Sequence, residues 1–197
     1  AIEYEPNYAE AHNNLGQLNN TENRLKDAVD CFDCAIKLNP DYAEAICNRG
    51  VVLDRLGQYE GALFDYQRAL VVRPEFAFAL NNMANTLRTL GRLDEAATVY
   101  RKALDLEPEA AKLHSNLGAV LIDSGRPEEA LVCYRKAVDL QPDYAEAFVN
   151  IASALAAQGD IEGAIAHMDK ALAVEPENAG WLVRKALFLP VISNSAE

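Results

Sequence analysis

The sequence is poor in basic residues and has no long apolar run. Its 197 residues include 18 Lys and Arg against 30 Asp and Glu, which gives a formal net charge of -12. Binding to phosphate depends on Lys and Arg that release counterions, so this balance disfavours nucleic acid and anionic membranes. No apolar stretch approaches the roughly 18 residues of a membrane-spanning helix, and the first residues lack the pattern of an export signal. We therefore expect a cytoplasmic protein.

Residues for metal binding or catalysis are also few. Cys31 and Cys34 have the Cys-x-x-Cys spacing, but a zinc site needs a second pair of ligands, and His12, His114 and His167 lie at unrelated positions. There is no phosphate-binding glycine loop and no Gly-x-Ser-x-Gly turn. We expect no metal, no cofactor and no catalytic residue in this chain. A chain of this length can bury a core without disulfides, so the four cysteines are expected to be reduced.

The sequence is dominated by a repeat of 34 residues. Six of the eight prolines follow this interval, as do a bulky column, a turn column and three columns of small residues. A fixed period in this range is typical of a repeat architecture. The proline column is Pro6, Pro40, Pro74, Pro108, Pro142 and Pro176; the bulky column is Phe32, Tyr66, Tyr100, Tyr134 and Met168; the turn column is Asn23, Gly57, Gly91, Gly125 and Gly159.

Each column has a physical reason in a pair of helices. Small residues allow two helices to approach, and the bulky residue fills the space between them. Glycine after the first helix adopts the left-handed conformation that closes it, and Asn23 is the usual substitute. Proline cannot continue a helix but suits the first turn of the next. Apolar residues such as Leu63, Tyr66 and Leu70 recur at helical spacing, and no segment alternates like a strand. The fold class is all-α.

These residues resemble the tetratricopeptide repeat family over residues 6 to about 182. Leu15, Gly16, Ala28, Phe32 and Pro40 occupy the family's signature columns in the first complete repeat. The resemblance implies a right-handed superhelical solenoid of antiparallel helix pairs. Within residues 6–178 we expect five complete repeats, at about 9–42, 43–76, 77–110, 111–144 and 145–178. Arg49 departs from a column of apolar residues, and we expect its stem to pack while its guanidinium contacts water.

The two ends look like cut repeats. Residues 1–5 align with the end of a second helix, and residues 179–197 begin a sixth first helix whose pattern is lost at Leu189 and Pro190. We expect a piece of a longer protein, because solenoids normally end in polar caps. The tail from Trp181 to Glu197 is weakly similar to the segment that joins repeats to the catalytic region in bacterial relatives of SPINDLY and O-linked N-acetylglucosamine transferase. That resemblance implies a glycosyltransferase parent.

A row of asparagines indicates where a partner would bind. In the tetratricopeptide family the first helix of each repeat lines a concave groove. A carboxamide both donates and accepts, so it can pair with the backbone of an extended peptide. We therefore predict a protein-interaction module that binds an extended peptide. The predicted groove column is Asn14, Asn48, Asn82, Asn116 and Asn150, with Asn13, Asn81, Asn85, Ser115 and Gln17 nearby.

Alternatives to this hypothesis remain open. Asparagine is common at this place in the family, so the row can reflect kinship between repeats. The chain can also act as the acceptor-recognition arm of a glycosyltransferase, or self-associate through its cut ends. A clamp for terminal carboxylates is excluded, because its cationic positions are Asn13, Phe78 and Asn82 here. A mild excess of acid in the groove columns predicts a neutral or mildly basic partner.

Overall fold

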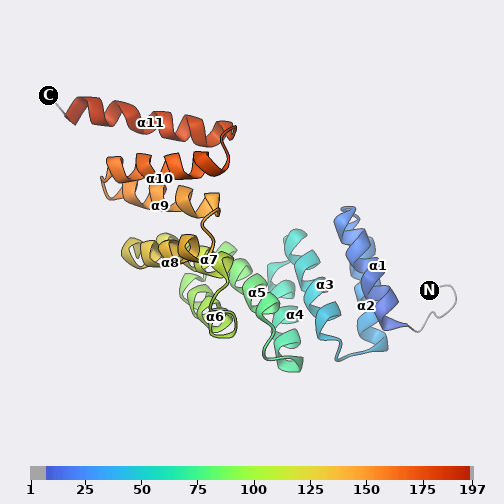
Figure 1. Cartoon of the computed structure of the whole chain (residues 1–197). Helices are drawn as coiled ribbons and strands as arrows, with labels where there is room; N and C mark the ends of the chain where they lie inside the picture. The colour runs from blue at the N-terminus through green and yellow to red at the C-terminus, as the bar shows by residue number, and fades with distance from the viewer. Residues whose placement is uncertain (1–7, 196–197) are drawn as a thin grey trace. The chain divides into compact units, whose positions relative to one another are not determined.

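The computed structural model describes residues 8–195, with side chains as far as Leu187. Within that range every regular element is an α-helix, and the helices follow one another as antiparallel pairs (Figure 1). The all-α prediction is confirmed. The predicted remnant helix at residues 1–5 lies outside the described residues.

The chain divides into two compact units, Ala1–Leu106 and Glu107–Glu197, which we call unit 1 and unit 2. Unit 1 holds three helix pairs and unit 2 holds two pairs and one further helix. The helices of unit 1 are α1 (Ala9–Thr21), α2 (Leu25–Leu38), α3 (Ala43–Arg55), α4 (Tyr59–Val72), α5 (Ala77–Thr89) and α6 (Leu93–Leu106). Those of unit 2 are α7 (Ala111–Asp123), α8 (Pro127–Leu140), α9 (Ala145–Ala157), α10 (Ile161–Val174) and α11 (Ala179–Ser195).

The small and bulky columns form the core of each pair, as their spacing predicts. Phe32 and Ala28 of α2 are fully buried beneath α1. A Cβ atom added to Gly16 of α1 would lie 2.6 Å from the Phe32 ring, closer than carbon atoms can approach. Gly16 therefore lets α1 lie directly on the aromatic ring of α2, and Gly50 and Gly118 do the same for Tyr66 and Tyr134 in their own pairs.

The turns inside the pairs also have the predicted conformation. Each member of the turn column has a positive φ, from 61° at Asn23 to 86° at Gly159. The proline column behaves differently from our expectation. Pro40 lies in the turn before α3 and not in the first turn of that helix, and Pro74, Pro108 and Pro142 take the same place. The missing amide hydrogen thus serves to end the preceding helix.

Arg49 is the clearest difference from the sequence-based expectation. Its guanidinium does not simply contact water but bonds two carboxylates. Nε and Nη2 donate to the two oxygens of Asp65, at 2.7 and 2.6 Å, and Nη1 donates to Asp33. Asp65 is only 1% exposed. The ion triad therefore joins α2, α3 and α4, and a buried carboxylate is the reason that an arginine occupies an apolar column.

Stacking within each unit brings the first helices together. In unit 1, α1 contacts α3 and α3 contacts α5, and in unit 2, α7 contacts α9. The second helices α2 and α4 each contact the first helix of the next pair. Each unit thus has one side formed by first helices, which we call its inner face. The last helix, α11, begins at Ala179, contacts α10 and continues past Pro190 to Ser195.

Two further observations bear on the sequence-based expectations. Among the described residues no helix is both long and apolar enough to cross a bilayer. No disulfide joins the four cysteines, all of which lie in the described range.

Candidate functional site

The inner face of unit 1 carries three parallel rows of side chains. Residues spaced by four and then three along a helix share one face, so each first helix contributes one row. Asn48 of α3 donates to Asn13 of α1, which shows that neighbouring rows lie side by side. The rows are Glu10, Asn14 and Gln17 on α1; Glu44, Asn48 and Val51 on α3; and Phe78, Asn82 and Asn85 on α5.

The predicted asparagine column differs in what its members contact within unit 1. Asn14 is exposed on α1. Asn48 Nδ2 donates to Asn13 Oδ1 at 3.0 Å, so half of its amide joins two repeats. Asn82 Nδ2 donates to the carbonyl of Phe78 in its own helix, at 2.9 Å. That carbonyl is in the first turn of α5 and is also the regular helical acceptor for the amide four residues later. The bond can therefore open at small cost when a ligand offers another acceptor.

The additional groove candidates are partly used for packing. Asn13 and Ser115 are each 4% exposed, which places them between repeats and not on the groove surface. Asn85 Oδ1 accepts a hydrogen bond from the hydroxyl of buried Tyr100, and so stabilises the pair α5–α6. Asn81, which directly precedes Asn82 in the sequence, is half-buried. The side chains that remain available to contact a ligand in unit 1 are therefore those of the three rows named above.

Unit 2 has the same asparagine column on its first helices, but the column continues into an arginine on α11. Asn116 and Asn150 are half-buried, and Asn150 Nδ2 lies 3.5 Å from Ser115 Oγ as a weak donor. One repeat later, Arg184 of α11 occupies the same column and donates to Ser153 Oγ at 3.2 Å. The interval of 34 residues leads directly from Asn150 to Arg184, which the predicted groove column did not include. Unit 2 thus presents a cation where unit 1 presents only carboxamides.

An aromatic cluster adjoins the carboxamides of unit 1. The side chain of Phe78 is 51% exposed in the first turn of α5, and its ring centroid lies 6.1 Å from that of Phe76. The guanidinium of Arg73 lies 3.7 Å above the Phe76 ring. Arg73 Nη1 also forms an ion pair with Glu44 of α3, at 2.9 Å. The four side chains form a continuous series from Glu44 to Phe78.

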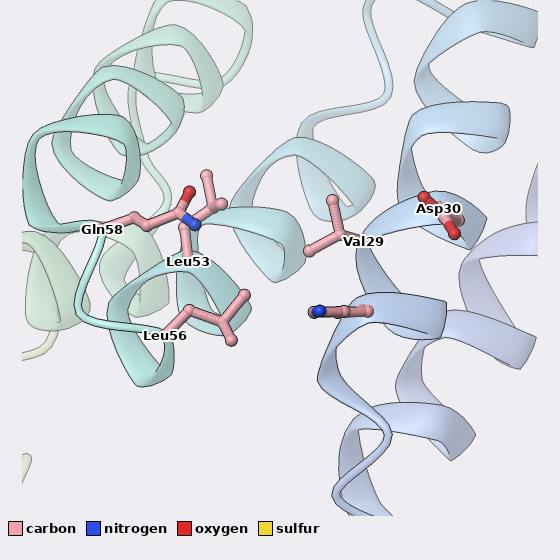
Figure 2. Close-up of a pocket in the computed structure, with 6 residues that line it drawn as sticks. Val29, Asp30, Leu53, Leu56 and Gln58 are labelled. Atoms are coloured by element: carbon pink, nitrogen blue, oxygen red, sulfur yellow. The ribbon is translucent and has the colours of Figure 1, made fainter.

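A small pocket opens elsewhere in unit 1, between α2 and the turn from α3 to α4. Figure 2 shows Val29 on one side of it and Leu53, Leu56 and Gln58 on the other. Its volume is about 280 Å³, which is below the usual range for small-molecule sites. Val29 and Leu56 already pack against the core residues Ala28, Phe32 and Val52. The pocket is therefore an edge of the core, bordered by the polar side chains of Lys26, Asp30 and Gln58.

No group of His, Cys, Asp or Glu among the described residues is arranged to hold a metal ion. The candidate site accordingly consists of carboxamides, one aromatic cluster and few charges. Such a surface can bind by hydrogen bonds and apolar contact. It holds no arrangement of nucleophile, base and orienting group.

Comparison with known families agrees with this architecture. Models described as tetratricopeptide repeat match residues 9–42 and 43–76, and a second model of that description matches 75–143 and 109–177. These matches cover most of the chain, so it belongs to the tetratricopeptide repeat family. Tetratricopeptide repeats are protein-interaction modules. No curated protein matches the sequence.

Solved structures share the fold. PilF of Pseudomonas aeruginosa is 22% identical, with a TM-score of 0.83, over 95% of this chain and 86% of that one. YrrB, described as a tetratricopeptide protein with an unusual peptide-binding site, is 24% identical, with a TM-score of 0.73 and coverage of 94% and 95%. MamA of Desulfovibrio magneticus RS-1 is 20% identical, with a TM-score of 0.78 and coverage of 87% and 97%. At these identities the likeness concerns the fold alone.

Proposed function

We propose that the inner face of unit 1 binds an extended peptide through the carboxamides of Asn14, which is exposed, and of Asn48 and Asn82, which are half-buried. The observation that carries this proposal is their placement on three successive first helices, on one continuous side of the unit. Each carboxamide offers one acceptor and two N–H donors, which match the alternating C=O and N–H of an extended main chain.

The expected affinity is modest. A neutral hydrogen bond contributes about 0.5–1.5 kcal/mol net, and three such groups supply only a few kcal/mol between them. Main-chain contacts carry no information about side chains. The three carboxamides alone thus favour weak, sequence-tolerant capture. A partner that is neutral or mildly basic agrees with the carboxylate of Glu10 at the end of its row.

The experiment is a selection of phage-displayed random dodecapeptides on the full chain, followed by calorimetry with a selected synthetic peptide. Asn14→Ala combined with Asn82→Ala is expected to weaken that peptide about tenfold or more, because two main-chain contacts are lost. Gln67→Ala is the matched control, since it removes an exposed carboxamide from the second helix α4. Equal affinity of the double variant and the control variant would refute the proposal.

Two broader hypotheses stay predictions. The family models match residues 9–177 and leave out the whole tail, so the similarity of that tail to a glycosyltransferase linker has no support here. Self-association is a separate prediction, for which light scattering against concentration is the test.

A further inference from the structure

The aromatic cluster beside Asn82 is unlike the equivalent place in any other repeat. In the other four complete repeats the column that holds Phe78 is charged, with Glu10, Glu44, Lys112 and Glu146 at the same position. A single exposed apolar residue on a protein surface needs no explanation by itself. Phe78 is different because its neighbours hold it in place.

The supporting contacts run from one first helix to the next. Phe78 lies against Phe76, with 6.1 Å between ring centroids. Arg73 covers the Phe76 ring at 3.7 Å, and Glu44 of α3 fixes Arg73 through an ion pair of 2.9 Å. Phe76 is thus held by a cation on one ring face, and the adjacent Phe78 ring remains 51% exposed. We call Phe76 and Phe78 together the phenylalanine ledge.

The two charged side chains of this cluster, Arg73 and Glu44, are paired with each other. The guanidinium of Arg73 is occupied by the Phe76 ring and by Glu44, and its Nε and Nη2 are buried without a hydrogen-bond partner among the described residues. Burying such donors is unfavourable, so the arrangement depends on the stacking and on the ion pair. Neither Arg73 nor Glu44 then offers a net charge to a ligand. The ledge is an apolar surface beside a cation and a carboxylate that are paired with each other.

The ledge is also adjacent to the main-chain contacts. Asn82 follows Phe78 by one helical turn, and its Nδ2 donates to the Phe78 carbonyl at 2.9 Å. A peptide held by Asn82 would place a neighbouring side chain over the Phe78 ring. We propose, on the basis of the function proposed above, that the ledge receives one large uncharged apolar side chain of the bound peptide, and so gives the groove its sequence preference.

The test uses the full chain and the same random dodecapeptide library. Wild type is expected to enrich peptides with one aromatic or large aliphatic residue, and the Phe78→Lys variant is expected to lose that enrichment. Burial of one such side chain predicts about a tenfold or larger loss of affinity when Phe78→Lys meets a peptide selected on wild type. The fold should tolerate the change, because Lys112 occupies this position one repeat later.

The matched control is Phe64→Lys, which removes an exposed phenylalanine (63% exposed) from the second helix α4. It should bind the selected peptide as wild type does, and both variants should melt within a few degrees of wild type. If wild type selects no peptide, both proposals fail. If selected peptides depend on Asn82 but show no apolar preference, or bind Phe78→Lys unchanged, only the role of the ledge is overturned.

Discussion

Arg49 and Asp65 form a two-point ion pair across a helix pair, with Nε and Nη2 of the arginine 2.7 and 2.6 Å from the two carboxylate oxygens. The hydrogen bonds that the Arg49 guanidinium donates to Asp65 raise its pKa above the ordinary value, against the opposing effect of burial. Asp65 is 1% exposed, so its carboxylate is buried. One repeat later the positions equivalent to Arg49 and Asp65 hold Met83 and Val99. A charged pair and an apolar pair are thus alternative solutions at the same place.

This equivalence predicts the result of a double-mutant cycle. Arg49→Met alone leaves a buried carboxylate without its cation, and should lower the free energy of unfolding by about 3 kcal/mol. Arg49→Met with Asp65→Val recreates the apolar pair of the next repeat and should recover most of that loss. Urea unfolding of wild type, both single variants and the double variant measures these values and completes the cycle. A double variant as unstable as the single one would contradict this account of the pair.

Two glycines predict opposite effects of the same substitution. Gly91 has a φ of +73° with no atom within 4 Å of an added Cβ, so Gly91→Ala should cost about 1 kcal/mol through backbone strain alone. Gly61 lies inside α4, where an added Cβ meets Leu53 at an ordinary 3.4 Å. Gly61→Ala should therefore stabilise by roughly 0.5–1 kcal/mol. Thermal unfolding measures the change in stability for both variants. A change of the same sign in both would contradict the positive φ of Gly91.

The cysteines are predicted to differ in reactivity. Burial raises the pKa of the Cys47 thiol to about 12, and raises that of Cys31 to a smaller extent, whereas Cys34 is exposed on α2. Because the thiolate is the reacting form, Cys47 should resist iodoacetamide at pH 8 in the folded protein. Peptide mass spectrometry over time should show Cys34 alkylated first and Cys47 last, and denaturant should abolish the difference. Early labelling of Cys47 would contradict its burial.

Peptide binding by unit 1 should depend little on salt. The proposed contacts are neutral carboxamides and an aromatic ring, and Glu44 is already paired with Arg73. Screening acts on charged pairs, so the affinity of a selected uncharged peptide should change less than about twofold between 50 and 500 mM NaCl. Calorimetry at both concentrations measures this. A steep loss of affinity with salt would instead indicate that charged residues bind the peptide.

The repeat period predicted the fold because each column has one packing task. Ala28 and Phe32 are buried, and Gly57 has a positive φ, as the columns require. What the columns could not show is how residues that depart from them compensate one another. Arg49 was recognised as a departure, but its partner Asp65, sixteen residues later, was missed because its own column contains residues as different as Cys31, Val99 and His167.

The candidate site was only partly predictable for a related reason. Helical spacing places Asn14 and Asn82 on the inner face, but it cannot show that Asn13 and Ser115, one position before the column, are buried between repeats. The phenylalanine ledge depends on Arg73 and Glu44 from different repeats, and such contacts have no signature in the period.

The most direct test of peptide capture is a crystal structure of the full chain with a selected dodecapeptide. The account predicts an extended peptide on the inner face of unit 1, with main-chain atoms about 2.7–3.2 Å from the carboxamides of Asn14 and Asn82. A peptide bound along the second helices, or in the pocket beside Val29 and Leu56, would contradict it.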